Sequence, residues 1–305
     1  MPNRLIVLLG PTGVGKTNLS IQIASHFKTD IISCDSRQIF KEMRVGTAVP
    51  SETDLAKIKH HFIGSHSILE YYSAAKYETD VLSLLPTLFA KNNIVLMTGG
   101  SMFYIDAVCK GIDDLPDVDT ELRERLIDRM ANEGIESLRN ELKYLDPDYY
   151  AEVDLKNPKR ILHALEICYM TGKPYSSFRS KQTKKRDFEI IKIGLNRDRN
   201  ELYDRINQRV EIMFDEGLEA EARKLFSHRE LNSLNTVGYR ELFDYFDGKI
   251  SVDEAKEKIK ANSRKYARKQ LTWFRRDNDV SWFHPDEADK IIDFLDIKLK
   301  VNDIK

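Results

Sequence analysis

The feature that most constrains this chain is the loop Gly10-Pro11-Thr12-Gly13-Val14-Gly15-Lys16-Thr17. It has the G-x-x-x-x-G-K-[ST] pattern of the P-loop, which many ATP-binding proteins use to hold phosphates. The apolar run 4–9 before it indicates a buried strand, and the repeat from Leu19 to Phe27 after it indicates a helix. A strand, a glycine-rich turn and a helix in this order give the pattern its specificity. The chain is therefore expected to bind a diphosphate or a triphosphate.

The residue types of this loop account for such binding. The glycines let successive backbone N–H groups converge on an oxyanion, and the helix N-terminus adds positive potential. Lys16 supplies a positive charge, and the Thr17 hydroxyl is a candidate Mg²⁺ ligand. The loop alone does not distinguish transfer of a phosphate from its release.

The rest of the first half predicts an α/β fold. Further short apolar runs lie at 30–33, 94–97 and 190–193, and helical patterns separate them. Alternating strands and helices favour a mostly parallel sheet with helical crossovers. From 198 onward the patterns predict helices up to 217, at 218–227 and at 252–276, with a strand at 280–283.

A purely helical block interrupts this pattern. Leucines recur at helical spacing between 122 and 145, and Asn157-Pro158 and Gly172 bound a further helix at 158–171. We therefore expect a P-loop NTPase-like parallel sheet core, residues 1–117 and 187–305, with an all-helical insertion domain at 118–186 and a helical C-terminal part.

Composition narrows the class of protein. The 305 residues contain 48 Lys and Arg against 49 Asp and Glu, which excludes a chain that is cationic all over but not one with a local basic face. No apolar run approaches the ~18 residues of a membrane span, and no signal peptide is evident. Cys34, Cys109 and Cys168 form no C-x-x-C pair, so reduced thiols are expected. A cytoplasmic monomer is the expectation.

Asp35-Ser36-Arg37-Gln38 follows the second predicted strand. Carboxyl ends of parallel strands border the ligand crevice, so Asp35 should lie near the P-loop. Its carboxylate could bind Mg²⁺, act as a general base on an acceptor, or cap the following turn. Gly99-Gly100-Ser101, at the end of a later strand, is either a second phosphate-approach turn or a tightly packed turn.

The helix predicted at 252–276 is strongly basic. From Ala255 to Arg276 it has nine Lys and Arg residues and one acid, with Tyr266, Trp273 and Phe274 interleaved. A second basic cluster lies at 179–186. Such surfaces track phosphates and stack on bases, which favours nucleic-acid binding over an ordinary solvated face.

Two other features are weaker. His60-His61 could suggest a metal, but adjacent histidines point in different directions and lack partners at ligand spacing, so a structural role is preferred. The aspartates between 113 and 119 lack the glycine and the terminal glutamate of a Ca²⁺ loop. They are interpreted as an acidic loop that caps the next helix.

Taken together, seven motifs closely resemble the tRNA dimethylallyltransferase family, the bacterial tRNA isopentenyltransferases. The motifs are the P-loop, Asp35-Ser36-Arg37-Gln38, Gly46-Thr47-Ala48-Val49-Pro50, His60-His61-Phe62-Ile63, Gly99-Gly100-Ser101-Met102-Phe103-Tyr104, Val237-Gly238-Tyr239-Arg240 and Arg268-Lys269-Gln270-Leu271-Thr272-Trp273-Phe274-Arg275. The resemblance covers the chain from residue 5 to about 283. Lys59 and Gly64 depart from residues common in the family, proline and aspartate, so no role is assigned to that segment.

The resemblance implies a reaction. The family transfers a dimethylallyl group from dimethylallyl diphosphate to N6 of the adenosine just 3′ of the anticodon, with Mg²⁺, on a P-loop-type core with a helical insertion. The implied partners are the tRNA anticodon stem-loop and dimethylallyl diphosphate. The alternatives are a P-loop kinase, in which Asp35 activates a hydroxyl, and an RNA-binding NTPase.

The resemblance also implies site residues. Asp35 would take the proton from the N6 amine, and the loop Gly10 to Thr17 would hold the leaving diphosphate, with Mg²⁺ on Thr17. Ser101 would hydrogen-bond the diphosphate, and Arg205 is a candidate clamp for it. Residues matching the tRNA-contacting segments are Asp35, Ser36, Arg37, Gln38, Lys159, Arg160, Ile161, Leu162, His163, Asn235, Thr236, Val237, Gly238, Tyr239, Arg240, Arg268, Lys269, Gln270, Leu271, Thr272, Trp273, Phe274 and Arg275.

Overall fold

The computed structural model describes residues 2–116, 119–179 and 182–301. The chain divides into two compact units, one formed by Met1–Cys109 with Lys185–Lys305 and the other by Lys110–Lys184. The insertion was predicted to begin at residue 118, which lies outside the described ranges. Asp117 of the predicted acidic loop and Lys181 of the second basic cluster also lie outside them.

The larger unit is built on a six-stranded parallel sheet with the order β3-β2-β4-β1-β5-β6. Its strands are β1 (Arg4–Leu9), β2 (Ile31–Cys34), β3 (His60–His61), β4 (Ile94–Gly99), β5 (Glu189–Leu195) and β6 (Val280–Phe283). The predicted parallel α/β core is confirmed, and the run predicted at 4–9 coincides with β1. The two-residue edge strand β3 was not predicted.

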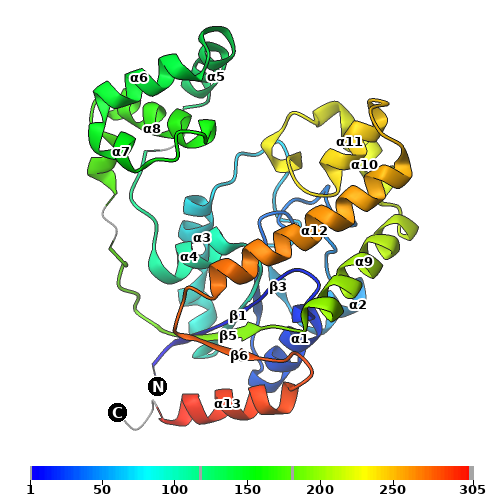
Figure 1. Cartoon of the computed structure of the whole chain (residues 1–305). Helices are drawn as coiled ribbons and strands as arrows, with labels where there is room; N and C mark the ends of the chain where they lie inside the picture. Colours follow the sequence, from blue (N-terminus) through cyan, green and yellow to red (C-terminus); the bar gives the residue numbers. More distant parts are fainter. Residues whose placement is uncertain (1, 117–118, 180–181, 302–305) are drawn as a thin grey trace. The chain divides into compact units, whose positions relative to one another are not determined.

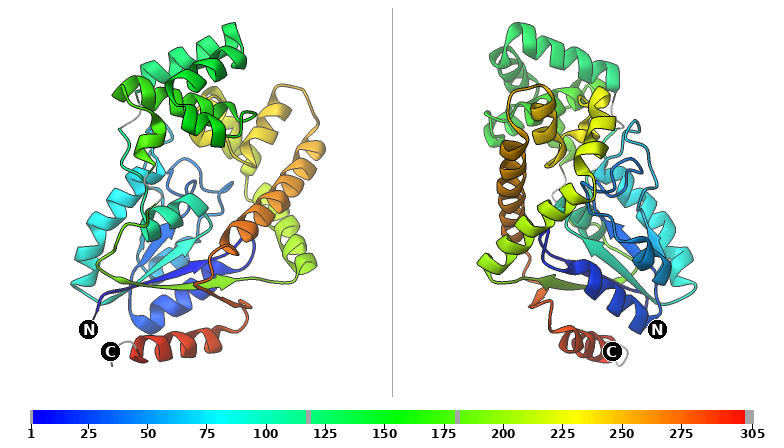
Figure 2. Two further views of the ribbon diagram at one scale, coloured as in Figure 1. Left: turned by 60° about the vertical axis from the view of Figure 1, so that its left-hand side comes forward. Right: turned by 90° about the vertical axis from the view of Figure 1, so that its right-hand side faces the viewer.

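Helices of the larger unit cover the sheet and extend beyond it. They are α1 (Lys16–Phe27), α2 (Glu52–Lys57), α3 (Ala74–Phe89), α4 (Met102–Lys110), α9 (Arg199–Asp215), α10 (Leu218–Leu225), α11 (Tyr239–Phe246), α12 (Val252–Phe274) and α13 (Ala288–Val301). Short 3-10 turns add η2 (Phe226–His228) and η3 (Asn232–Leu234). Figure 1 shows α12 running beside α9, and both views of Figure 2 agree.

Side chains of β1 alternate between two apolar cores because successive residues of a strand face opposite ways. Leu5, Val7 and Leu9 pack with α3 and α4, and Ile6 and Leu8 pack with α1, α9 and α13. Helix α13 lies below the sheet on the side of α1 (Figures 1 and 2). All of β1 is buried, so the loop that follows it is held on a rigid strand.

Helix α12 was predicted at 252–276 and is observed at Val252–Phe274. It begins at a capping box, in which Ser251 and Glu254 exchange hydrogen bonds between side chain and backbone. A buried ridge that includes Ala267, Gln270 and Phe274 faces the core. The opposite faces carry most of the basic residues, as expected for an amphipathic helix.

Within its described residues the smaller unit has helices and no strand, as predicted. It contains α5 (Thr120–Glu133), α6 (Ile135–Leu145), α7 (Pro147–Glu152), α8 (Pro158–Thr171) and the 3-10 turn η1 (Tyr175–Phe178). The prediction of 158–171 is confirmed to the residue, with the Asn157 side chain as N-cap and Gly172 in the left-handed conformation as C-cap. Asp119 caps α5, as the acidic-loop interpretation predicts.

Within the described residues, no helix combines the length and the apolar character that crossing a membrane would require.

Candidate active site

A cavity of about 560 Å³ opens beside the P-loop, at the carboxyl ends of β1, β2 and β4. Its lining comes mainly from the loop itself, Asp35, Arg37, Gln38, the segment 46–51, α9 and α12. Segments far apart in the sequence therefore meet at the sheet edge where parallel α/β folds bind ligands.

The P-loop has the backbone conformation that its glycines predict. Gly13 and Gly15 have φ values of 79° and 110°, in the left-handed region that a side chain would strain. A Cβ on Gly13 would also lie 2.8 Å from Cγ1 of Ile206, so glycine is required there for space as well. Gly15 is the N-cap of α1, which directs the first helical N–H groups toward the cavity.

The Lys16 side chain folds back and binds the start of its own loop. Its Nζ donates to the carbonyl oxygens of Gly10 and Pro11, each at 2.8 Å. Burial, together with the nearby charge of Arg209, lowers the pKa of Lys16 to about 7, and Asp35 partly opposes both effects. An anion at this loop would raise that pKa again, because an opposite charge favours the protonated amine.

Asp35 is held by the turn that it begins. Its Oδ1 accepts hydrogen bonds from the backbone N–H groups of Arg37 at 2.9 Å and of Gln38 at 3.3 Å. The turn-capping alternative is thus observed, and it fixes the carboxyl group on the wall of the cavity. Capping does not compete with a role as base, because it orients the group for one.

The other members of this motif build the site. Arg37 donates to the carbonyl oxygens of Asn232 and Ser233, at 3.1 and 2.9 Å. Gln38 donates to those of Thr47 and Ala48, at 3.0 and 3.1 Å. Both side chains therefore fix segments of the cavity wall, an arrangement that the prediction of direct tRNA contact did not foresee.

Ser101 lies on the far side of this turn from the P-loop cavity. Its Oγ accepts from the backbone N–H of Ser36 at 2.8 Å and donates to the Ser36 hydroxyl at 3.1 Å. Ser101 lines a second cavity and is not part of the P-loop cavity wall, whereas Gly99 and Gly100 are. Close packing explains Gly99, since a Cβ there would lie 1.9 Å from the carbonyl oxygen of Cys34.

The second cavity, of about 410 Å³, adjoins the first. Arg37 and Tyr266 line both cavities, and Ser36 lines the second. Its wall is rich in aromatic side chains, of which Tyr71 and Phe103 are 48% and 61% exposed. Further aromatic lining comes from Phe40, Tyr72 and Tyr104. Exposed rings around a cavity offer stacking surfaces for a planar ligand.

Helix α9 brings two arginines to the P-loop. Arg205 Nε donates to the carbonyl oxygen of Gly13 at 3.0 Å, and its side chain is exposed. Arg209 lies one turn further along, less exposed, and donates to Thr12 Oγ1 at 3.2 Å and to the Thr47 carbonyl oxygen at 3.4 Å. Arg209 lines the cavity together with Lys16 and Asp35, and burial lowers its pKa. Arg205 was a predicted site residue and Arg209 was not, although the spacing of four residues puts both on one helix face.

Gln270 joins α12 to the P-loop. Its side chain is 2% exposed; Oε1 accepts the Thr12 N–H at 2.9 Å, and Nε2 donates to the Gly100 carbonyl oxygen at 2.8 Å. Contact of Gln270 with tRNA stays a prediction; in this structure its side chain holds the P-loop and lines the cavity. Ile161, Tyr239 and Phe274 are likewise buried and serve packing.

The remaining residues of the predicted tRNA segments divide by exposure. Those classed as exposed are Lys159, Arg160, Asn235, Arg240, Arg268, Lys269, Thr272 and Arg275. Leu162, His163, Thr236, Val237, Leu271 and Trp273 are partly buried, and Gly238 is buried. The Trp273 indole donates to Asp106 at 2.7 Å, so that ring is part of the core side of α12. Lys159 to His163 belong to α8 of the smaller unit.

The two histidines of β3 make local hydrogen bonds. A ring nitrogen of His60 lies 2.8 Å from the Ile58 carbonyl oxygen, and one of His61 lies 2.8 Å from the Asp30 carboxylate. The His60 contact is local, and the His61 contact joins the edge strand to the residue before β2, so both fit the structural role preferred from the sequence.

Comparison with known proteins gives consistent matches. A family model described as IPP transferase matches residues 38–277. The chain is 59% identical over 296 residues to a protein named tRNA dimethylallyltransferase 1 from Bacteroides fragilis strain YCH46, covering 97% of this chain and 98% of that one. It also resembles the crystal structure of a tRNA isopentenylpyrophosphate transferase from Bacillus halodurans, with 32% identity, a TM-score of 0.71 and coverage of 98% and 97%.

A third match supports the fold alone. The structure of a eukaryotic dimethylallyltransferase acting on tRNA has a TM-score of 0.79 at 24% identity and covers 93% of this chain and 74% of that one.

Proposed function

The chain belongs to the IPP transferase family and is a tRNA dimethylallyl transferase, and we propose that its donor is dimethylallyl diphosphate and its acceptor N6 of the adenosine 3′ of the anticodon, position 37. The products would be N6-dimethylallyladenosine and diphosphate. One observation carries the proposal: the P-loop cavity, which Asp35 lines, adjoins the aromatic cavity, and Arg37 and Tyr266 line both. Two unlike substrates can therefore lie next to one another, with the Asp35 carboxylate on the diphosphate side.

The P-loop side suits an allylic diphosphate. Breaking its C–O bond leaves the electron pair on the diphosphate and positive charge on the allylic carbon. Loop amides, Lys16 and Arg209 surround the place where that negative charge would grow. The cavity wall also carries apolar residues, among them Val49, Met213 and Ile259, which suit a hydrocarbon group.

The aromatic side suits a nucleobase. An adenosine stacked in an anticodon loop must leave its stack to reach a buried centre, and exposed rings compensate for the stacking that it loses. Its N6 lone pair would attack the allylic carbon as the C–O bond breaks. The excess proton on N6 would pass to Asp35, whose Oδ1 is engaged by the backbone, so we assign the proton to Oδ2.

Mg²⁺ is the proposed cofactor. The cavity offers oxygen donors, the ligands that this ion prefers: the Thr17 hydroxyl and the Thr98 hydroxyl. Thr98 Oγ1 is buried with no hydrogen-bond partner among the described residues, which fits a donor reserved for a bound group. When bound, the ion would stabilise charge on the diphosphate. We also propose a cytoplasmic monomer that binds the anticodon stem-loop, since one chain supplies both cavities.

The direct test is incubation of the purified protein with labelled dimethylallyl diphosphate, Mg²⁺ and unmodified tRNA. Label should enter tRNA, and the donor should not be consumed without tRNA. ATP turnover that needs no tRNA, with no label transferred, would instead support the kinase or NTPase alternatives.

A first prediction concerns the basic face of α12. Replacing Arg268 and Lys269 with alanine should weaken tRNA binding and make its dependence on salt shallower. Each phosphate that the protein no longer neutralises takes about 0.7 (single strand) to 0.9 (duplex) from the slope of log K against log salt. Titration of tRNA at several salt concentrations measures both quantities.

The matched control lies on the same helix. Lys256 and Lys260 already bind Glu211, at 2.9 and 2.6 Å, so their replacement by alanine should leave the slope unchanged. Affinity for dimethylallyl diphosphate should be unaffected in both variants. If Arg268→Ala with Lys269→Ala leaves slope and affinity as in the wild type, the RNA lies elsewhere and this face is merely solvated.

A second prediction follows from the pKa of Lys16, which is about 7 in the free protein. Diphosphate binding should raise it, so the complex takes up about half a proton at pH 7 and close to one at pH 8. Affinity should therefore fall as pH rises above 7. Calorimetry at pH 8 in two buffers of different ionisation enthalpy measures the uptake, and Lys16→Arg, which stays charged, should abolish it. Zero uptake in the wild type would contradict the assignment.

A further inference from the structure

Behind the P-loop, on the side away from the cavity, lies an arginine that neither the sequence motifs nor the proposed reaction uses. Arg197 follows β5 and precedes α9, and it is 9% exposed. Its Nε donates to the carbonyl oxygen of Val14 at 2.9 Å, in a buried contact. We propose that Arg197 is a positioning residue that orients the P-loop for the diphosphate.

The planarity of the peptide bond supplies the physical link. The Val14 carbonyl and the Gly15 N–H belong to one trans peptide unit, so they point in opposite directions. A hydrogen bond that draws the carbonyl toward Arg197 turns the Gly15 N–H away from Arg197. Gly15 lines the cavity and is the N-cap of α1, so that N–H is directed into the phosphate cradle.

This peptide needs an external restraint because glycines flank it. Gly13 and Gly15 both have positive φ, and glycine resists rotation less than any other residue. Two groups also lie close behind the loop: a Cβ on Gly15 would be in van der Waals contact with Arg197 Nη2 and with Pro285 Cβ, each at 3.6 Å. Arg197 and Pro285, which follows β6, therefore pack against the back of the loop.

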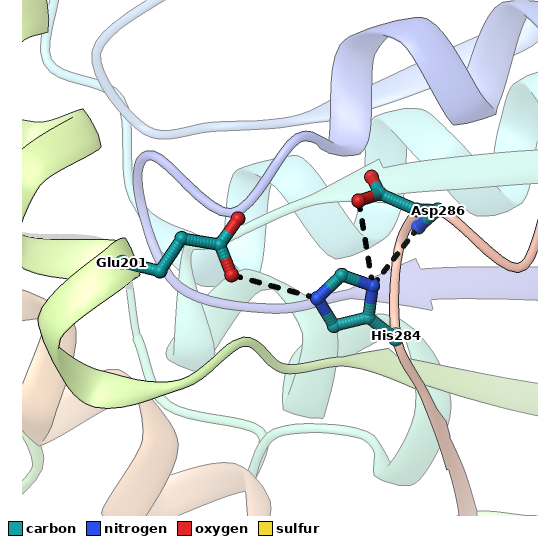
Figure 3. Close-up of side chains that lie close together, drawn as sticks. All are labelled: Glu201, His284 and Asp286. Carbon is teal, nitrogen blue, oxygen red and sulfur yellow. Dashed lines mark hydrogen bonds and ion pairs between the residues drawn. The ribbon is translucent and has the colours of Figure 1, made fainter.

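The guanidinium is itself held in place by two carboxylates from two other segments. Asp286 accepts from Nη2 at 2.6 Å and from Nη1 at 3.2 Å, and Glu201 of α9 accepts a short bond from Nη1. Figure 3 shows the His284 ring between these two carboxylates, with 3.6 Å to each. We assign the carboxylates to Arg197 rather than to a cation, because the guanidinium already donates to both.

The charges of the cluster indicate that its role is orientation. Two carboxylates more than neutralise the arginine, so Arg197 contributes little net positive potential to the cavity. The contribution that Arg197 makes to the loop is therefore the hydrogen bond from its Nε to the Val14 carbonyl oxygen. This inference rests on the proposed function, because it assumes that the loop holds a diphosphate.

Two substitutions separate the hydrogen bond from everything else. In Arg197→Gln the side-chain amide nitrogen stands the same number of bonds from the backbone as Arg Nε, and it can donate to Val14. In Arg197→Met a methyl group takes that place and donates nothing. Neither retains the ion pairs. Glu201 and Asp286 are 42% and 66% exposed, so removal of the arginine leaves no deeply buried charge and both variants should fold.

The experiment measures binding of inorganic pyrophosphate with Mg²⁺ by calorimetry, and prenyl transfer to tRNA in single turnover. Arg197→Met should raise the pyrophosphate Kd about tenfold and lower the rate at saturation by about 10- to 100-fold. Arg197→Gln should stay within about threefold of the wild type in both. Arg4→Met is the control, since Arg4 is also a buried arginine, lies at the end of β1 away from the P-loop and is bound to Glu189; it should lower Tm only.

Equal losses in the Gln and Met variants would overturn the proposal, as would wild-type binding and rate in Arg197→Met. If Arg197→Met does not fold, Asp286→Ala tests the same point, with a twofold to fivefold rise in Kd expected and an unchanged Kd overturning the proposal. A wild-type protein that binds no pyrophosphate would overturn both this inference and the proposed function. A wild type that binds it, with Arg197→Met binding equally well, would overturn this inference alone.

Discussion

Asp35→Asn should lower the rate of prenyl transfer by about 10²- to 10⁴-fold while both substrates still bind, because a general base contributes about that much. The structure makes asparagine a clean substitution. Asp35 Oδ1 accepts the backbone N–H groups of Arg37 and Gln38, and an asparagine oxygen can accept both. The turn should survive and the proton acceptor should be lost. Single-turnover transfer at saturating tRNA and dimethylallyl diphosphate measures the step.

Two further variants distinguish loss of the base from loss of the turn cap. Asp35→Ala removes the cap as well as the base, so it should also lose some stability, whereas Asp35→Asn should not. Asp119→Asn is a matched control, since Asp119 caps α5 in the other unit through the Leu122 N–H at 2.9 Å. It should leave the rate unchanged. A wild-type rate for Asp35→Asn would show that the residue serves the turn only.

Local signals allowed much of the fold to be predicted. The P-loop, β1 and α8 lie where predicted. Residues in the sequence mark their ends: glycines in the loop, and an N-cap and a proline at the first position of the helix. The edge strand β3 was missed because two residues give no periodicity, and its position depends on pairing with β2. Helix α13 was not predicted, although Ile291, Leu295 and Leu299 recur at helical spacing and are buried.

The site was harder to predict than the fold because its residues come together only when segments far apart in the sequence pack against one another. Sequence spacing put Arg205 and Arg209 on one face of a helix, but only the packing of α9 against the P-loop distinguishes the exposed cation from the enclosed one. Gln270 follows two exposed basic residues in the sequence, yet it lies on the buried face of α12, where its side chain accepts the Thr12 N–H. Segments that match a family motif therefore mix surface residues with the residues that support them.

Lys16→Ala should reduce the rate at saturation by about 10²- to 10³-fold, and should weaken donor binding by much less. The reason is that charge on the diphosphate grows as the allylic bond breaks, so the lysine contributes more to the transition state than to the ground state. In the free protein its ammonium group is already satisfied by the Gly10 and Pro11 carbonyl oxygens. Binding a diphosphate must exchange those bonds for new ones, which limits the gain in affinity. The measurement is single-turnover rate against the dissociation constant of dimethylallyl diphosphate.

Arg205→Ala is the comparison for this prediction. Its guanidinium is exposed and bound to the Gly13 carbonyl oxygen, so solvent screens its charge and its loss should cost far less than that of Lys16. Lys16→Met fills the volume without the charge and should behave like Lys16→Ala, which separates the charge from the space that it occupies. Should the dissociation constant rise in Lys16→Ala while the saturated rate holds, the lysine binds both states equally. Stabilisation of the departing diphosphate would then have to come from Arg209 and the loop amides, whose orientation depends on the peptide that Arg197 holds.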